Sequence, residues 1–317
     1  MLTRLPPVRG RYTEQAPLGD TSWFRTGGKA EVLYKPADFN DLADFLKGCP
    51  EDIPVTVLGV CSNVIIRDGG IKGVVIKLGG PFAEITVNPD GTLTAGAAAL
   101  DFNVAIAAQR AGRTGLEFFS GIPGTIGGAL RMNAGAYGRE TIDGLLEMTT
   151  IDRVGCVRVH ERKDIRMSYR YSDIPENFIF TSARFSTTED APEAIEARMA
   201  AIKEKRTSSQ PIRAKTGGST FANPTPEERI KAGLPEDMKA WQMIDKAGCR
   251  GLIIGGAQMS EQHCNFMLNV NNASSADLEA LGEEVRRRVK DLFGYTLRWE
   301  IKRIGVPADE IAVAGHA

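Results

Sequence analysis

The sequence predicts a protein of mixed helices and strands that folds as two or three packed domains. At 317 residues, the chain is longer than one hydrophobic core usually organises. Within residues 1–80, a stretch with helical apolar spacing stands beside short β-branched runs cut by glycines. This mixture indicates an α/β module at the start of the chain, and two hairpin patterns and further helical segments follow it.

The first elements are predicted from spacing and end signals. Residues 38–48 predict an amphipathic helix, because Phe39, Leu42, Phe45 and Leu46 follow helical spacing between a capping Asp38 and a terminal Gly48. Three β-branched runs predict strands at 55–59, 63–70 and 73–78. Turn residues at 89–91 predict a hairpin over 85–97, and a second hairpin is expected around 153–155.

Three further helices are predicted downstream. Residues 101–112 have Asp101 as a cap and Gly112 as a stop, and residues 190–206 begin at Asp190 and end with basic side chains. Residues 276–294 form an amphipathic pattern, and residues 295–305 alternate as a strand. The Ser-Ser-Gln-Pro run at 208–211 is typical of a boundary between domains.

Composition excludes several classes of function. A formal charge of -1, with 25% charged residues, argues against a broad nucleic-acid or membrane surface. Five scattered cysteines without a C-x-x-C pair suggest neither a disulfide framework nor a metal site. No apolar run approaches the ~20 residues of a membrane-spanning helix, and the N-terminus has no signal-peptide pattern. We therefore expect a cytoplasmic protein; a protein partner cannot be inferred.

Two glycine-containing segments are candidates for binding an anion. Nine glycines lie from Gly112 to Gly144, and residues 121–129 are the densest part. Such spacing lets backbone amides face a pyrophosphate, although a run of tight turns fits the pattern equally well. Neither G-x-G-x-x-G nor a P-loop ending is present. The second segment, LGVCSN at 58–63, is weak alone, but the two together would suit a dinucleotide gripped along its length.

These segments resemble a known family. Residues 115–138, GLEFFSGIPGTIGGALRMNAGAYG, are similar to the flavin-binding signature of UDP-N-acetylenolpyruvoylglucosamine reductases, and residues 58–63 to the second FAD loop of that family. Further similar blocks follow in family order: YRYS at 169–172, GGSTFANP at 217–224, the stretch from 244 to 269, and LRWEIKRIG at 297–305. The resemblance therefore extends over nearly the whole chain.

The resemblance implies an α+β protein of three regions. Residues 1–80 and 81–206 would form a PCMH-type FAD-binding fold, residues 207–305 an α/β substrate domain, and residues 306–317 a tail. The short interval between Ser172 and Ser219 favours the type II subgroup, which lacks an extra loop over the substrate.

The resemblance also assigns site residues. Arg170, Ser219 and Glu300 match the catalytic positions: an arginine beside the substrate enol, a proton-donating serine, and a glutamate that assists the enolate or its protonation. The substrate would contact Tyr169, Asn223 and His263. FAD, bound without a covalent link, would contact Gly59, Ser62, Asn63, Gly121, Ile122, Gly124, Thr125, Gly127, Gly128, Asn133, Ala134 and Gly135. Taken alone, the three catalytic candidates would fit a surface arginine, a capping serine and a solvated carboxylate, and His263 an interior imidazole.

The implied reaction has two halves in one pocket. NADPH, as co-substrate, reduces FAD and leaves, and the enolpyruvyl ether of UDP-N-acetylglucosamine enolpyruvate is then reduced for peptidoglycan synthesis, the pathway of cell wall biogenesis, cell shape and cell division. The charged fork of Arg170 suits a carboxylate or enolate. The Ser219 hydroxyl is a poor acid unless its surroundings resupply its proton.

Some residues depart from the family pattern, and two other functions remain open. Val60 and Cys61 stand where glycine or another small or polar residue is usual, and Thr220 and Ala222 replace a large apolar and a basic residue. These changes place affinity for the nucleotides in doubt but remove no catalytic group. The alternatives are a flavin oxidoreductase of the wider superfamily with another substrate, and a noncatalytic nucleotide-sugar binding protein.

Overall fold

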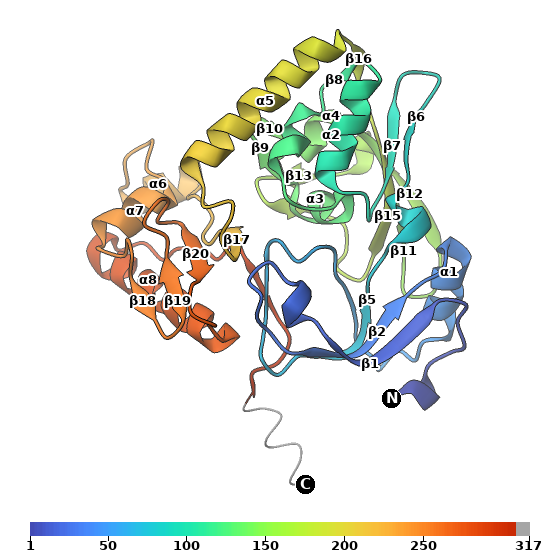
Figure 1. The fold of residues 1–317 in the computed structure, drawn as a ribbon, viewed down its shortest axis with the longest axis horizontal. Coiled ribbons are helices and arrows are strands. Elements are labelled where there is room, and N and C mark those ends of the chain that lie inside the picture. The colour runs from blue at the N-terminus through green and yellow to red at the C-terminus, as the bar shows by residue number, and fades with distance from the viewer. Residues whose placement is uncertain (309–317) are drawn as a thin grey trace. The chain divides into compact units, whose positions relative to one another are not determined.

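The computed structural model describes residues 1–308 of the chain. The residues cluster into two compact units. Figure 1 labels most of the helices and strands named below. Unit 1 comprises residues 1–15, 31–60 and 73–206, and unit 2 comprises 16–30, 61–72 and the residues from Thr207 onward. Segments from the N-terminal part of the chain thus join the C-terminal part in unit 2.

The first sheet of unit 1 carries one helix. Its order is β1 (Arg11–Pro17), β2 (Lys29–Lys35), β5 (Ile71–Ile76) and β3 (Val55–Val57). Helix α1 (Phe39–Gly48) buries Leu42, Phe45 and Leu46 in a core with Val32 and Tyr34 of β2. The Asp38 side chain accepts a hydrogen bond from the Asp41 amide, so the predicted helix and its cap are confirmed.

A second sheet of unit 1 has five antiparallel strands. Its order is β12 (Val157–Glu161), β11 (Leu145–Ile151), β15 (Ile179–Phe185), β7 (Leu93–Gly96) and β6 (Ile85–Val87). Antiparallel pairing of β6 with β7 and of β11 with β12 confirms both predicted hairpins. Helices α2 (Asp101–Arg110) and α3 (Ile126–Met132) pack against this sheet through one apolar core. Figure 1 shows both helices beside β7 and β15.

The predicted cap of α2 is wrong. Leu100 occupies the N-cap position and makes no side-chain hydrogen bond, while Asp101 is the first helical residue. The Asp101 carboxyl is completely buried instead of turning toward the first amides of the helix. The stop is confirmed, because the helix ends at Arg110 and Gly112 adopts a positive φ of 63°.

Short elements complete unit 1. The pairs are β8 (Arg113–Thr114) with β16 (Thr188–Glu189), β9 (Gly135–Ala136) with β10 (Arg139–Glu140), and β13 (Met167–Ser168) with β14 (Tyr171–Ser172). Short helices are η1 (Leu2–Arg4), η3 (Gly80–Ala83), η4 (Glu117–Gly121), α4 (Thr141–Gly144) and η5 (Arg162–Asp164). Helix α5 (Pro192–Ser209) confirms the helix predicted from residue 190 and ends within the predicted 208–211 boundary segment.

Unit 2 has its own sheet and core. The sheet order is β17 (Thr216–Ser219), β20 (Phe266–Asn269), β19 (Ala257–Met259) and β18 (Ile253–Ile254). Helices α7 (Ala240–Lys246) and α8 (Ser275–Phe293) contribute Met243, Leu278 and Val285 to the core. Unit 2 also contains η2 (Gly19–Thr21), α6 (Pro226–Ala232), and the parallel pair β4 (Val64–Ile66) and β21 (Lys302–Ile304).

The strand predicted over 295–305 is shorter than expected. Only β21 is a regular strand, and residues 295–301 make a single bridge, between Trp299 and Phe221. Leu297 and Ile301 are nevertheless buried while Arg298 and Lys302 are exposed, because the extended chain passes over the core without a continuous partner.

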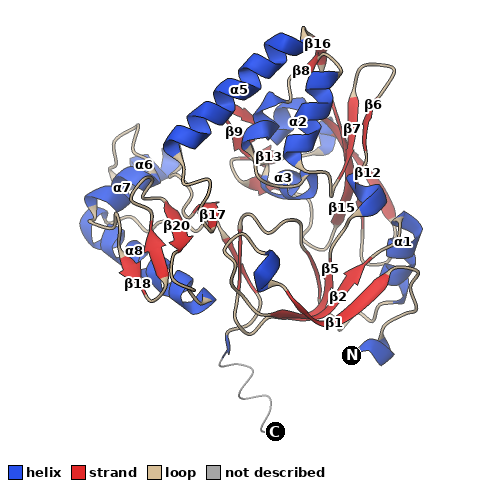
Figure 2. Cartoon of the chain, viewed as in Figure 1, coloured by secondary structure: helices blue, strands red, loops and turns tan. Residues whose placement is uncertain are grey.

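The distribution of helices and strands in Figure 2 confirms the α+β class. Of the predicted tail, 306–317, residues 309–317 lie outside the described part of the chain. No helix in the described part is both long and apolar enough to cross a membrane.

Candidate functional site

The glycine-rich loop at residues 121–128 connects η4 to α3 in unit 1. An antiparallel neighbour, residues 97–101, holds its second half: the Asp101 amide donates to Gly124 O (3.1 Å), and the Ile126 amide donates to Ala99 O (3.0 Å). The Gly127 amide donates to Ala97 O (2.8 Å). No backbone hydrogen bond within residues 1–308 uses the Thr125 amide, which therefore remains available as a donor.

The glycines of this loop allow close packing against the rest of unit 1. A Cβ on Gly124 would lie 2.7 Å from Asp101 Oδ2. A Cβ on Gly59, from the second predicted FAD loop, would lie 2.6 Å from Thr125 Oγ1. Gly59 and Thr125 are thus in contact, and the structure brings parts of the two predicted loops together. At Gly128, by contrast, a Cβ would meet only Thr125 Oγ1, at an ordinary 3.8 Å.

Asn133 connects the glycine-rich segment to the turn that carries Arg170. Its buried amide nitrogen donates to Glu140 Oε2 (2.7 Å) and to Ser168 O (3.1 Å), and its Oδ1 accepts from the Ile142 amide (3.0 Å). Ser168 ends β13, so this contact lies directly before Tyr169 and Arg170. The Arg170 guanidinium lies over the Tyr169 ring, 4.7 Å from its centroid. Ala134 and Gly135 follow in the same segment, and Gly135 pairs with Glu140.

Four of the seven non-glycine residues with positive φ in the described part of the chain lie in the predicted motifs. Cys61, Asn133, Tyr137 and Arg170 have φ values of 54°, 45°, 56° and 58°, in the left-handed region that non-glycine residues rarely adopt. The conformation of Cys61 explains why glycine would suit this position, where the sequence departs from the family pattern. Such residues concentrate at functional sites because surrounding structure must enforce them.

Ser219 and Glu300 lie on neighbouring stretches of backbone in unit 2. Ser219 ends β17, opposite Phe266 of β20, and the next residue, Thr220, accepts a hydrogen bond at its carbonyl from the Glu300 amide (2.9 Å). Thr220 in turn donates its amide to Asn265 O (2.7 Å). The two predicted catalytic residues of this unit are therefore fixed by the same set of backbone hydrogen bonds.

Asn63 holds the same stretch from its other side. Its Nδ2 donates to Glu300 O (3.1 Å), and its carbonyl accepts from the Lys302 amide (3.0 Å). Asn63 and its neighbour Ser62, both predicted FAD contacts, belong to unit 2, whereas Gly59 belongs to unit 1. The structure thus shows a connection from Asn63 to Glu300 that the sequence pattern did not predict.

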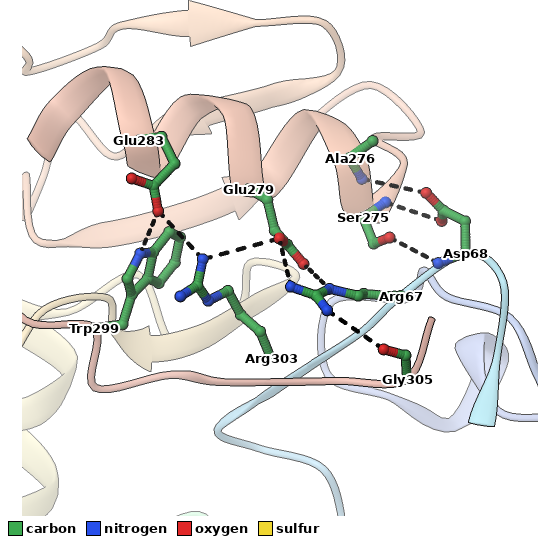
Figure 3. Close-up of polar contacts among 9 residues, drawn as sticks. All are labelled: Arg67, Asp68, Ser275, Ala276, Glu279, Glu283, Trp299, Arg303 and Gly305. Carbon is green, nitrogen blue, oxygen red and sulfur yellow. Dashed lines mark hydrogen bonds and ion pairs between the residues drawn. The ribbon is translucent and has the colours of Figure 1, made fainter. Parts of the chain in front are cut away.

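Side chains on α8 hold Trp299 and Arg303, which flank Glu300 in the sequence, as Figure 3 shows for these two residues. Glu283 accepts hydrogen bonds from Trp299 Nε1 (2.9 Å) and Arg303 Nη1 (3.2 Å), and the Arg303 guanidinium lies over the Trp299 ring. Glu279 pairs with Arg67 at 2.7 Å, which ties the end of β4 to the same helix. Because these contacts come from both sides of Glu300 and from β4, they limit movement of the β21 segment.

Asp68 completes this network at the start of α8. Its two carboxylate oxygens accept from the Ser275 amide (3.0 Å) and the Ala276 amide (3.2 Å), as Figure 3 shows. These amides belong to the first turn of the helix, where backbone donors have no partner within the helix itself. Asp68, from a distant part of the sequence, therefore adds two acceptors to the start of α8, beside the N-cap residue Ser274.

The two predicted substrate residues of unit 2 have structural contacts. Asn223 Oδ1 accepts from the Ala240 amide at the start of α7 (3.1 Å). His263 Nδ1 accepts from the Asn265 amide (3.3 Å), and the ring lies 4.8 Å from Phe266, the partner of Ser219. Burial lowers the pKa of His263, which favours a neutral imidazole.

The structure therefore places the predicted residues in two groups. Unit 1 holds Gly59, the 121–128 loop, Asn133 to Gly135, Tyr169 and Arg170; unit 2 holds Ser62, Asn63, Ser219, Asn223, His263 and Glu300. Two further residues were missed by sequence reasoning. The Asn265 side chain accepts a hydrogen bond from the Phe221 amide and donates one to the Phe221 carbonyl. The Asp101 carboxyl packs against Gly124. Neither residue stands in a pattern that indicates its contacts.

Known protein families match both the N-terminal and the C-terminal part of the chain. Residues 30–160 match an FAD binding domain, and residues 210–304 match the C-terminal domain of UDP-N-acetylenolpyruvoylglucosamine reductase. The reductase of that name from Rhodospirillum rubrum is 52% identical over 98% of this chain and 96% of its own length. The one from Parvibaculum lavamentivorans is 53% identical, over 96% and 95%.

A solved structure extends the similarity to the fold. The crystal structure of UDP-N-acetylenolpyruvylglucosamine reductase from Thermus caldophilus aligns with a TM-score of 0.78 at 29% identity. The alignment covers 94% of this chain and 100% of that one. Similarity in sequence and in fold thus extends over nearly the full length, and the chain belongs to the UDP-N-acetylenolpyruvoylglucosamine reductase family.

Proposed function

We propose that the chain reduces the enolpyruvyl group of UDP-N-acetylglucosamine enolpyruvate to give UDP-N-acetylmuramate, with FAD as cofactor and NADPH as donor. The observation that carries this proposal is identity above 50% over nearly the full length to named reductases. The proposed setting is peptidoglycan precursor synthesis in the cytoplasm, with the cell wall, cell shape and cell division depending on the product.

The 121–128 loop has features that fit FAD. The Thr125 amide has no backbone acceptor among the described residues, and the space next to Gly128 is open. A free amide beside an open glycine suits a phosphate oxygen, because nothing blocks its approach. The side chain of Asn133 is occupied by three protein contacts, so its proposed role is to hold the loop next to Tyr169 and Arg170. Bound FAD would supply the hydride chemistry.

Arg170 is proposed to bind the carboxylate and the developing enolate of the substrate. Its guanidinium is permanently charged and has paired donors that match two oxygens of a carboxylate. The stacking on Tyr169 and the left-handed backbone limit the directions in which this half-buried side chain can point. A cation that is already oriented stabilises the negative charge that develops on the substrate in the transition state.

Ser219 is proposed to donate the proton to the ether-bearing carbon, with Glu300 assisting. Gly218, directly before Ser219, has a φ of 80° and no atom within 4 Å of where a Cβ would stand. This open space leaves room for a substrate beside the hydroxyl. Asn223 and His263 are proposed to contact the UDP portion; the oxygen of the Asn223 side chain accepts from the Ala240 amide at the start of α7, which fixes the orientation of this side chain.

The spectrum of the purified protein tests cofactor, donor and acceptor together. Under anaerobic conditions, one equivalent of NADPH should bleach a flavin band, and UDP-N-acetylglucosamine enolpyruvate should restore it. Bleaching without recovery would instead indicate a flavin oxidoreductase with another substrate. A preparation free of FAD that also fails to bind added FAD would leave only a binding protein.

Ser219→Ala separates the two halves of the reaction. This variant should be bleached by NADPH at the wild-type rate, and recovery with the enolpyruvyl sugar should slow by about 10²–10⁴-fold, the usual contribution of a general acid. Ser208→Ala, in the last turn of α5, serves as the matched control. If Ser219→Ala recovers as fast as this control, Ser219 is not the proton donor.

A further inference from the structure

The most unusual titratable group of unit 1 is the carboxyl of Asp101. The residue has no exposed surface, and neither carboxyl oxygen has a partner with hydrogen-bond geometry. Buried carboxylates normally have several donors or a cation beside them, because the unpaired charge is strongly disfavoured in an apolar environment. An isolated buried carboxyl of this kind requires an explanation.

The position of Asp101 links it to the glycine-rich loop. Its backbone amide donates to Gly124 O, and its Oδ2 lies 2.7 Å from the point where a Cβ on residue 124 would stand, too close for any residue other than glycine. Leu100 and Thr125, the neighbours of Asp101 and Gly124 in the sequence, form an antiparallel bridge. The carboxyl therefore packs against the Gly124 backbone on the side where a Cβ would stand, and supports the loop there.

We propose that Asp101 is a positioning residue whose uncharged carboxylic acid supports the 121–128 loop, and that ionisation of this carboxyl weakens the binding of FAD by the loop. The proposal rests on the proposed function only for the identity of the ligand. An uncharged carboxyl is similar in shape to an asparagine side chain and can remain under Gly124 without a counter-ion. A charged one would be driven to expose itself, and the loop would have to move.

The electrostatic surroundings support the uncharged form. Burial is the largest cause acting on the pKa of Asp101 and raises it well above its usual range; the Gly124 amide, which is near the carboxyl but outside hydrogen-bond geometry, opposes this shift. Among the described residues, no charged or titratable side chain of α2, of residues 97–100 or of the loop contributes to the shift. A folded pKa above the unfolded value gives stability that is complete below the unfolded pKa and is lost as pH rises through the folded pKa.

The first test uses the stability of the FAD-free protein and does not depend on cofactor binding. Asp101→Asn keeps the shape of the neutral acid but cannot ionise, so the Tm of this variant should rise relative to wild type as the pH increases from 5 to 9. Asp44→Asn, which changes an exposed carboxylate of the same unit, should show no such trend. A Tm difference between Asp101→Asn and wild type that is equal at pH 5 and pH 9 would overturn the proposal.

The second test measures FAD affinity by titration at pH 7. Asp101→Asn should bind FAD within about threefold of wild type, whereas Asp101→Ala, which leaves a cavity under Gly124, should bind about tenfold more weakly or worse. Wild-type affinity in Asp101→Ala would show that Asp101 does not position the loop. If wild-type protein binds no FAD at all, the proposed function fails, while the pH dependence of stability still decides the state of Asp101.

Discussion

Gly59 and Thr125 provide a test of whether the two predicted FAD loops are as closely packed as the structure indicates. Gly59→Ala would place its Cβ 2.6 Å from Thr125 Oγ1, which is shorter than the van der Waals contact distance of non-bonded heavy atoms. The φ of Gly59 is not in the left-handed region, so alanine is compatible with the backbone and the penalty is steric. Overpacking of this kind costs about 1–3 kcal/mol.

Removing the obstructing atom should remove the penalty. In Thr125→Ala the nearest remaining side-chain atom would be Cβ, 3.7 Å from the new methyl group, which is an ordinary contact. Gly59→Ala should therefore be nearly neutral in the Thr125→Ala background, and the coupling between the two changes should be about 1–3 kcal/mol, within the range found for residues in contact.

Thermal unfolding of the FAD-free protein measures this coupling. Because 1 kcal/mol corresponds to about 2–4 °C for a unit of 150–250 residues, Gly59→Ala alone should lower Tm by about 2–12 °C. Gly79→Ala is the matched control: it changes another glycine of unit 1 whose φ is not in the left-handed region, and no atom lies within 4 Å of its new Cβ. If the loss of Tm in the double variant equals the sum of the losses in Gly59→Ala and Thr125→Ala, the close packing of the two loops is refuted.

Two further predictions concern single side chains of unit 2. Thr220 Oγ1 is buried without a hydrogen-bond partner, so Thr220→Val should raise stability by about 1 kcal/mol in thermal unfolding. Thr216→Val should instead lower it by about 1 kcal/mol, since Thr216 Oγ1 donates to Met267 O (2.7 Å); equal effects of both changes would contradict this reasoning. Asp68→Ala should cost about 0.5–2 kcal/mol by removing the acceptors of two first-turn amides of α8, while the N-cap Ser274 remains, and Asp68→Asn should cost less because one acceptor remains. A loss in Asp68→Asn as large as in Asp68→Ala would show that the carboxylate acts through its charge rather than as a cap.

Local signals in the sequence predicted the local elements well. The helix from Phe39 to Gly48 and both hairpins of unit 1 follow from apolar spacing and turn residues, which act over a few positions. Residues 295–305 show the limit of such signals. Their alternation reflects burial on one side of the chain, whereas a strand also requires a hydrogen-bonded neighbour, and only residues 302–304 have a continuous one.

Contacts between distant parts of the chain were not predictable in this way. Asp101 has the residue type of a helix cap and stands at the start of the helical pattern, and only the packing against Gly124 explains why its carboxyl is buried. Asn63 was predicted to contact FAD because its segment resembles an FAD loop. In the structure its side-chain amide donates a hydrogen bond to the carbonyl of Glu300, which lies 237 positions away. Such pairings depend on the complete fold, and nothing in either local pattern indicates them.

The same long-range contacts explain why the departures in the GGSTFANP segment are compatible with the fold. Thr220 acts through its backbone, because its carbonyl binds the Glu300 amide and its amide binds Asn265. Ala222 likewise donates its amide to Arg298 O (2.9 Å). Neither contact depends on the side chain, so replacement of a large apolar or basic residue at these positions leaves the hydrogen bonds around Ser219 and Glu300 in place. In unit 2, main-chain hydrogen bonds of residues 220 and 222 therefore help to hold the proposed acid and its assisting carboxylate, and the side chains at these two positions are able to vary.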